Sequence, residues 1–233
     1  DEITLAVVDA LKMRLAQAER SAVMKHATNN IQAREMCLKG RFHVSRMTRD
    51  GIETGISYFE KALAADPSYA LAQVGLAHAY RMDGLTLEMP PLEVGPRAKA
   101  AALKAIQLDD TLGEAHAVLA FSLFWYEWAW DISRKHFERA LQLDPNNAYT
   151  LWMFAHLSSN LGRHDEALAA IARARELDPL SGLINAMEGQ FLLHAGRTDD
   201  AIHRLRESLE LDSKSRVAHL FTANAYIAKG LLE

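Results

Sequence analysis

The sequence predicts an all-α fold in which pairs of antiparallel helices stack into a solenoid, and three observations support this. First, a pattern that begins at Ala148 recurs 34 residues later, so that Gly162 falls on Gly196 and Asp165 on Asp199. Second, alanine and leucine abound while runs of β-branched residues are scarce, which favours helix. Third, each copy has a short glycine turn in its middle and an aspartate break at its end. Self-similarity at this period is typical of helical repeat proteins.

Composition narrows the classes of partner. The chain has 233 residues, a formal net charge of −4 and 49% hydrophobic residues, which fits an ordered chain without a polyanion-binding field. We therefore expect no nucleic acid partner. We also expect no membrane partner, because no apolar run approaches the roughly 20 residues that cross a bilayer. Cys37 is the single cysteine, which excludes an intrachain disulfide and favours a reducing, cytoplasmic location.

Residues 1–30 predict one amphipathic N-terminal helix, which we interpret as the possible end of a preceding domain. Its apolar residues recur at helical spacing: Ile3, Val7, Val8, Leu11, Leu15 and Ala18. The segment Thr28-Asn29-Asn30 then supplies capping residues for the next helix. Because the chain opens at Asp1 without a methionine, we interpret it as a fragment of a longer protein.

We expect the repeat array to span residues 31–233, with its first two repeats at about 31–69 and 70–112. The first repeat ends at Asp66-Pro67, because proline cannot continue a helix. In the second repeat we expect helices from Ala70 and over Ala98–Leu108. The stretch Asp83–Pro96, which holds Pro90-Pro91, predicts an irregular insertion between them.

The remaining repeats are predicted at about 113–147, 148–181 and 182–215, and 216–233 predicts the first helix of a sixth repeat. Small residues recur where the two helices of a pair should approach most closely: Gly55, Ala98, Ser133, Ala167 and Ala201. Each helix pair has two apolar sides and cannot bury both alone, so neighbouring pairs are expected to stack.

This pattern resembles the tetratricopeptide repeat family over roughly residues 31–233. The sequence departs from the family's Leu-Gly pair, which is Phe154-Ala155 and Glu188-Gly189 here, and from its final proline, which is Asp110 and Ser213. The resemblance implies a right-handed superhelical α-solenoid. It also implies a concave groove, lined by the first helix of each pair, that binds peptides or partner proteins.

A finer resemblance is carried by the segments DEITLAVVDALKMRL, CLKGRF and WYEWAWDISRKHFERALQLDPNNA. They are similar to arrays that follow a TolB-like segment in multidomain bacterial signalling proteins. This resemblance implies a bacterial source and a signalling context. No effector module of such proteins is visible in the sequence, so the resemblance carries none of their activities over to this chain.

If the first helices line the groove, eleven residues are candidates for contact with a partner: Val74, His78, Phe121, Trp125, Tyr149, Trp152, His156, Met187, Gln190, His194 and Asn224. The alternative, which we rate equally, is that many of them pack between repeats. Chaperone-binding members of the family hold a terminal carboxylate with Lys, Asn and Arg. This sequence has Val74, His78, Trp152 and His156 at such places, so we predict no carboxylate clamp.

No residue constellation predicts catalysis, so we expect no enzyme, no cofactor and no metal site. The histidines form no His-x-x-x-His helical pair of the kind that zinc hydrolases use. The acid pairs Asp165-Glu166 and Asp199-Asp200 recur at the start of second helices, which indicates capping and dipole compensation.

We therefore predict a non-catalytic protein–protein interaction scaffold or regulatory module that binds a peptide or a partner protein in its groove. The alternative is a sensor domain in which the aromatic groove encloses a small apolar ligand. We also predict self-association through an exposed apolar face of the last helix. That face consists of Val217, Leu220, Phe221, Tyr226, Ile227 and Leu231.

Overall fold

A computed structural model describes residues 28–86 and 90–230, and every regular element in these two ranges is an α-helix. The predicted all-α fold class is therefore confirmed. The predicted helix 1–30 lies outside the described residues except for its last three positions. Among the described helices, none combines the length and hydropathy needed to span a membrane. The chain divides into two compact units at Trp128, and each is described by itself.

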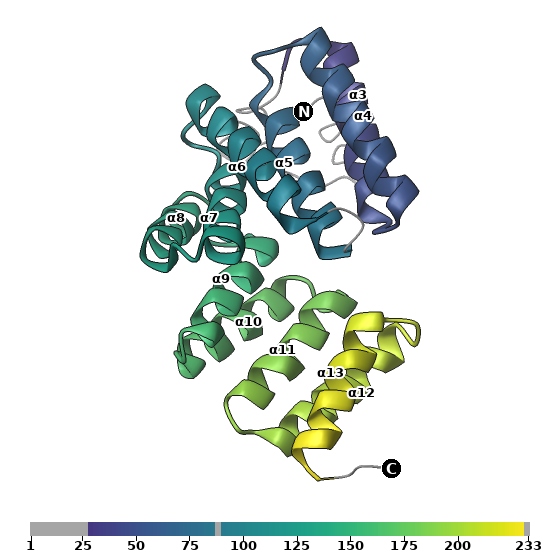
Figure 1. Ribbon diagram of the computed structural model, residues 1–233, viewed down its shortest axis with the longest axis vertical. Helices are drawn as coiled ribbons and strands as arrows, with labels where there is room; N and C mark the ends of the chain where they lie inside the picture. The colour runs from purple at the N-terminus through teal and green to yellow at the C-terminus, as the bar shows by residue number, and fades with distance from the viewer. Residues whose placement is uncertain (1–27, 87–89, 231–233) are drawn as a thin grey trace, which may run out of the picture. The chain divides into compact units, whose positions relative to one another are not determined.

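Unit 1 holds the helices up to Trp128 (Figure 1). In chain order they are α3 (Ile31–Ser45), α4 (Arg49–Ala65), α5 (Ala70–Thr86), α6 (Pro91–Leu108) and α7 (Gly113–Glu127).

Unit 2 holds the helices from Ala129 onward (Figure 1). They are α8 (Trp130–Leu143), α9 (Ala148–Asn160), α10 (His164–Leu177), α11 (Gly182–His194), α12 (Thr198–Leu211) and α13 (Arg216–Ala228).

Helix packing inside each unit separates an inner from an outer layer. Consecutive helices pack against each other, and the odd-numbered helices also contact one another. In unit 1 these further contacts join α3 with α5 and α5 with α7. In unit 2 they join α9 with α11 and α11 with α13. Within the described ranges, the even-numbered helices do not contact one another to a comparable extent. Because the odd-numbered helices approach each other more closely, they lie on the inner side of the curve of each unit. We call them the first helices and the even-numbered ones the second helices.

Close helix–helix approaches occur where one side is a very small residue. A Cβ added at Gly189 on α11 would lie 2.5 Å from Leu205 Cγ on α12, and one at Gly40 on α3 would lie 2.8 Å from the Phe59 ring on α4. Phe59 and Leu205 are 1% and 0% exposed. The five small residues that the sequence singled out on the second helices are all buried: Gly55, Ala98, Ser133, Ala167 and Ala201.

Side-chain caps begin most of the first helices. Asn30, Asn147, Ser181 and Ser215 accept hydrogen bonds from main-chain N–H groups of α3, α9, α11 and α13. Each bond satisfies one of the donors that the first turn of a helix leaves unpaired. The predicted capping role of Asn30 is confirmed.

Glycine turns connect the helices of the later pairs. Gly162 and Gly196 have φ values of +72° and +74°, a left-handed conformation that costs a residue with a Cβ extra energy. At the corresponding position after α7 stands Trp128, with φ +57° and 73% of its surface exposed. The turn geometry is therefore kept even where glycine is replaced.

The predicted irregular insertion Asp83–Pro96 is wrong in its extent. Helix α5 continues to Thr86 and α6 begins at Pro91, so helix covers most of the segment. Pro91 occupies the first helical position, where no main-chain hydrogen bond is lost. Pro96 lies inside α6 and removes one bond to the preceding turn. Prolines can thus mark the start of a helix as well as a loop.

Candidate interaction surface

All eleven candidate residues lie on first helices. Val74 and His78 belong to α5, Phe121 and Trp125 to α7, and Asn224 to α13. The candidates on α9 and α11 are Tyr149, Trp152, His156, Met187, Gln190 and His194.

Their exposure differs sharply. Four side chains are buried in the packing of their unit: Val74, Phe121, Trp152 and Met187. Four are half-buried, namely His78, Tyr149, His156 and Gln190, and three are exposed, namely Trp125, His194 and Asn224. The buried group supports the first-helix layer from within. Because Phe121 and Trp152 are packed rings, the structure gives no support to an aromatic chamber for a small apolar ligand.

In unit 2 the structure brings several candidates together across α9 and α11. The Trp152 ring lies 5.5 Å from Tyr149 and 6.3 Å from His156, centroid to centroid. The His156 ring lies 5.7 Å from Phe191 on α11. These contacts form a continuous aromatic seam between two consecutive first helices.

A hydrogen bond closes the far end of this seam. Ser159 Oγ on α9 lies 2.9 Å from His194 Nδ1 on α11. Partial burial of the imidazole in an otherwise exposed residue, and secondly the nearby His164, lower the pKa of His194, which favours its neutral form. The imidazole therefore joins the two helices as an uncharged group at neutral pH.

In unit 1 a charged side chain lies buried beneath the corresponding face, because Arg81 on α5 is 0% exposed. The Arg81 guanidinium lies 4.7 Å from the centroid of the Phe121 ring, and Phe121 stacks on Trp125 at 5.8 Å. Burial lowers the pKa of Arg81 to about 10, so the side chain stays protonated at neutral pH. Burial, with help from the arginines Arg81 and Arg41, holds the pKa of His78 well below its usual value.

An ion pair that the sequence does not predict lies on this face. Arg41 Nη2 on α3 lies 2.9 Å from Glu114 Oε2 at the start of α7, and both side chains are partly exposed. The thiol of Cys37 lies in the same neighbourhood, and burial raises its pKa. The available signal was the charge of Arg41 one turn after Cys37, but no periodicity predicts that α3 reaches α7.

Unit 2 separates charge between its two helix layers. Helices α9, α11 and α13 contain Glu188 and Arg216 as their only Asp, Glu, Lys or Arg residues. The second helices are rich in charge; α8, for example, carries Asp131, Arg134, Lys135, Glu138 and Arg139.

Glu188 does not break this separation, because it points toward the second helices. Its Oε2 atom lies 2.8 Å from Arg175 Nε on α10 and 3.1 Å from Arg204 Nε on α12. The side chain is buried. Its charge is thus neutralised beneath the first-helix layer.

Glu166 serves a comparable purpose. It lies in the first turn of α10, as the predicted dipole compensation requires, but no side-chain hydrogen bond caps this helix, so the capping half of that interpretation is wrong. Its carboxylate accepts two hydrogen bonds from Arg134 on α8, of 2.9 and 2.7 Å, and one of 2.8 Å from Ser158 on α9. The Arg134 hydrogen bonds, followed by that of Ser158, lower the pKa of Glu166 to about 2. This is a structural ion pair. Asp200 likewise lies 2.7 Å from Arg197.

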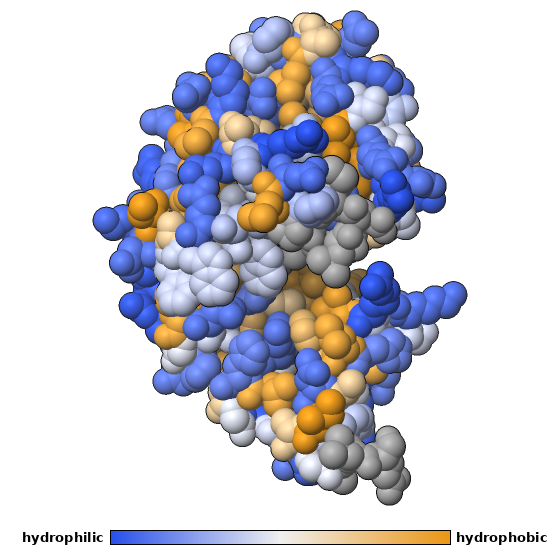
Figure 2. Space-filling view, viewed as in Figure 1, coloured by the Kyte–Doolittle hydropathy of each residue, from blue (hydrophilic) through white to orange (hydrophobic). Residues whose placement is uncertain are grey.

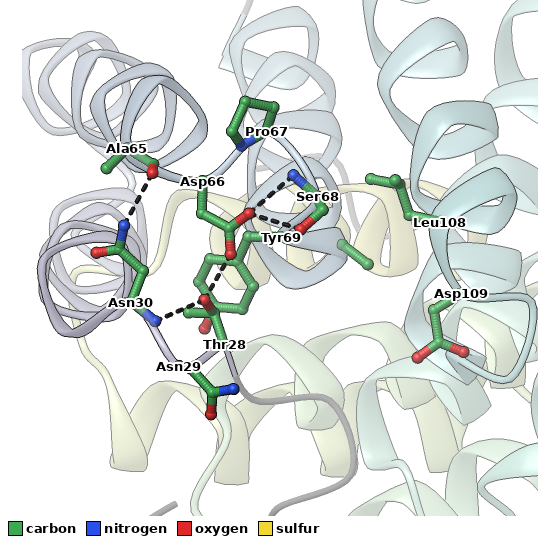
Figure 3. A pocket seen from close by; sticks show the side chains of 11 residues that line it. Thr28, Asn29, Asn30, Ala65, Asp66, Pro67, Ser68, Tyr69, Leu108 and Asp109 are labelled. Atoms are coloured by element: carbon green, nitrogen blue, oxygen red, sulfur yellow. Dashed lines mark hydrogen bonds between the residues drawn. The ribbon is translucent and has the colours of Figure 1, made fainter.

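An open depression in unit 1, of about 550 Å³, lies beside the turn between α4 and α5 (Figure 3). Asp66 accepts hydrogen bonds from Thr28 Oγ1 at 2.5 Å and from Ser68 Oγ at 2.6 Å, and Asn30 donates to the Ala65 carbonyl. Thr111 and Asp109 repeat the Ser68–Asp66 pattern one repeat later. These bonds hold the turns that end the second helices, so we assign the depression a structural role. Across the described ranges, no three His, Cys, Asp or Glu side chains cluster in a way that could hold a metal ion.

Comparison with known proteins supports the fold. A family model described as tetratricopeptide repeat matches residues 133–190, which span α8 to α11. No curated protein matches the chain significantly by sequence.

Three solved structures illustrate the likeness. The tetratricopeptide repeat protein TTC0263 of Thermus thermophilus is 18% identical, with a TM-score of 0.67 over 84% of this chain and 99% of that one. The pilus biogenesis factor PilW is 18% identical, with a TM-score of 0.64 over 88% of each chain. Human IFIT1, in a dimer with m7Gppp-AAAA, is 23% identical, with a TM-score of 0.74 over 85% of this chain and 47% of its own. The fold is therefore that of stacked tetratricopeptide-type helix pairs.

Proposed function

We propose that the chain is a non-catalytic protein–protein interaction module that binds a peptide or partner protein on its first-helix face. The observation that carries this proposal is the charge separation in unit 2. Second helices facing solvent are charged, as a solvated surface requires. First helices instead combine exposed apolar side chains, such as Leu220 and Ile227, with neutral polar ones. An apolar surface with few charges is typical of the centre of an interface.

The hydropathy of the surface agrees with this interpretation. Figure 2 shows hydrophobic side chains gathered over the part of unit 2 that contains α11 and α13. Leu220 and Ile227 on α13 are 59% and 57% exposed. Exposed apolar residues spaced seven apart lie on one side of a helix, so they offer one continuous contact stripe.

Two of the similar structures point to different classes of ligand. YrrB, at 20% identity and a TM-score of 0.50, is described as a tetratricopeptide repeat protein with an unusual peptide-binding site, and the IFIT1 structure contains capped RNA. For this chain we favour protein over RNA. Nucleic acid affinity requires cations that neutralise phosphates, and the first helices of unit 2 offer Arg216 alone. We further propose, from the sequence resemblance, that the module is a regulatory part of a bacterial cytoplasmic signalling protein.

Affinity capture with a matched pair of variants tests this function. Leu220→Arg places a charge on the first-helix face, and Glu210→Arg places the same side chain on the outer helix α12. Both positions are exposed, so both variants should fold. We expect Leu220→Arg to lose partner proteins that wild type and Glu210→Arg retain. Equal capture by all three proteins, or retention of RNA in place of protein, would contradict the proposal.

We also propose self-association through α13. The exposed Leu220 and Ile227 can meet the same residues of a second copy in a two-fold contact. Light scattering over a concentration series checks this, with Leu220→Glu/Ile227→Glu as the variant. A strictly monomeric wild type at high concentration would rule it out.

A further inference from the structure

In unit 1 one contact joins two first helices that are not neighbours. Helix α5 lies between α3 and α7 and packs against both. The ion pair of Arg41 on α3 with Glu114 on α7, with 2.9 Å between Nη2 and Oε2, therefore reaches across α5. Its two side chains are 45% and 39% exposed, so the pair lies at the surface of the first-helix layer and not beneath it. We call this ion pair the strap.

Side chains of α3 and α5 lie close to the strap on its inner side. Burial first, then the charges of Arg81 and Arg41, hold the pKa of His78 on α5 well below its usual value, which places Arg41 near His78. Cys37 lies one turn before Arg41 on α3 and is 2% exposed. Burial raises the pKa of the Cys37 thiol, and the charges of Arg41 and Glu114 act on it in opposite directions. Both members of the strap therefore lie near this buried thiol.

Unit 2 has no means of forming such a contact at the corresponding place. There α9 and α13 flank α11 in the way that α3 and α7 flank α5. Arg216 is the only Asp, Glu, Lys or Arg residue of α9 and α13, so opposite charges from these two helices cannot meet across α11. The strap is thus a property of unit 1 and not of the repeat.

A contact of this kind opens easily. A partly exposed ion pair shifts an equilibrium by only about 2- to 5-fold. Dissolved salt screens the attraction between exposed charges, and more so as its concentration rises. The strap should therefore exchange between closed and open arrangements, with the open one favoured at high ionic strength.

We propose that the strap is a closing device of unit 1. While it is formed, Arg41 and Glu114 cover the inward face of α5 around His78, and when it opens, that face and the thiol of Cys37 become accessible. The uncharged inward face of unit 2 has no such closure. The chain therefore presents one face whose access depends on ionic strength and one whose access does not. This inference goes beyond the proposed function and does not depend on the identity of a partner.

Labelling of Cys37, the only cysteine of the chain, tests the strap. The whole protein is treated with N-ethylmaleimide, an uncharged thiol reagent, and the rate is followed by mass spectrometry from about pH 7 to 9, where thiols ionise. We expect Glu114→Gln and Arg41→Gln each to raise the rate by about 2- to 5-fold. Raising NaCl from about 0.05 to 0.5 M should accelerate wild type by a similar factor and leave both variants unchanged.

Glu127→Gln is the matched control. Glu127 also lies on α7, and its ion pair with Lys99 on α6 is 2.7 Å long and similarly exposed, but it joins two helices that are direct neighbours. This variant should be labelled like wild type. Equal acceleration by Glu127→Gln would show that any lost ion pair of unit 1 exposes the thiol, and the strap would be overturned.

The two strap variants separate opening from a change in thiol chemistry. Loss of Glu114 lowers the pKa of the Cys37 thiol and loss of Arg41 raises it. If the pair acted on the thiol alone, labelling would become faster in Glu114→Gln and slower in Arg41→Gln. Opening of the strap accelerates both. Opposite changes in rate, or a wild-type rate that does not respond to salt, would therefore overturn the closing device.

Discussion

The first helices of the two units share one backbone arrangement and differ in the chemistry that they carry. In unit 1 an ion pair lies on the face, where Arg41 of α3 meets Glu114 of α7. In unit 2 the face is nearly free of charge, and the buried Glu188 is neutralised by Arg175 and Arg204 on the second helices.

This difference shows how a repeat can keep its shape and change its surface. Where two helices pack closely, the residue at the contact has to be small in both units: Gly40 in unit 1 and Gly189 in unit 2. The outward positions of the first helices are free of that constraint, so they can hold charge in one unit and neutral polar groups in the other. A partner of unit 2 should accordingly bind with little dependence on ionic strength.

The largest expected effect comes from removing the large side chain that packs against these glycines. Phe59→Ala in unit 1 and Leu205→Ala in unit 2 should each cost about 3–5 kcal/mol in the free energy of unfolding, through lost burial and the cavity left behind. Hydrogen exchange sharpens the comparison. We expect each variant to lose protection mainly in its own unit, because repeat arrays are stabilised by nearest neighbours. Equal loss throughout both units would show a single cooperative block.

Breaking the buried ion pair in unit 2 should have the next largest effect. Glu188→Ala leaves the guanidinium groups of Arg175 and Arg204 without their shared carboxylate, so we expect a loss of about 2–3 kcal/mol. Denaturant unfolding measures it. Glu210→Ala, an exposed acid on α12, is the control and should change stability by under about 0.5 kcal/mol.

Acid unfolding should reveal Glu166. Its folded pKa of about 2 lies below the ordinary 4.5, so its contribution is fully present above pH 4.5 and is lost as the pH falls toward 2. Glu166→Gln should cost about 1–2 kcal/mol at pH 7 and flatten the decline in stability between these pH values. Asp165→Asn is the neighbouring control. A variant whose acid profile matches wild type would show that Glu166 does not stabilise the fold.

A smaller effect on stability is expected from replacing glycine by alanine, and its sign should differ between two sites. Gly196→Ala adds a Cβ at φ +74° with no atom within 4 Å, so strain alone should cost about 1 kcal/mol. Gly182→Ala, in the first turn of α11, adds a Cβ 3.6 Å from Asp212 Cβ and should stabilise by about 0.5–1 kcal/mol. Thermal unfolding compares the two. The turn assignment is contradicted if both variants shift Tm in the same direction.

The smallest effect is expected for the ion pair on the face of unit 1. A double-mutant cycle over Arg41→Ala and Glu114→Ala should give a coupling of about 0–1 kcal/mol, because both side chains are partly exposed. This coupling should fall in high salt, whereas that of Glu188 with Arg204 should persist. If salt weakened both couplings equally, the ion pairs of the two units would not differ in their exposure to solvent, and the comparison of the two units would be wrong.

Much of the fold could be predicted because its signals are local. The 34-residue period, the glycine turns at Gly162 and Gly196 and the buried alanines Ala167 and Ala201 all report on neighbouring helices of one chain segment. The boundary of α6 was missed because Pro91 suits a first helical turn as well as a loop. The candidate residues were placed on the right helices, but their exposure could not be predicted. Trp152 and Asn224 were both predicted to line the groove from a first helix. In the structure Trp152 is buried and Asn224 is exposed.

The sequence by itself determined the helix pairs, their period and the near absence of charge on α9, α11 and α13, because these properties follow from residue type and spacing along the chain. The tertiary structure alone decided that Arg41 meets Glu114, that Glu166 is held by Arg134 and that Glu188 points away from the first-helix face. Those contacts join helices of different repeats. They depend on side-chain direction and on how closely two helices approach, and neither is encoded in the periodicity of a single helix.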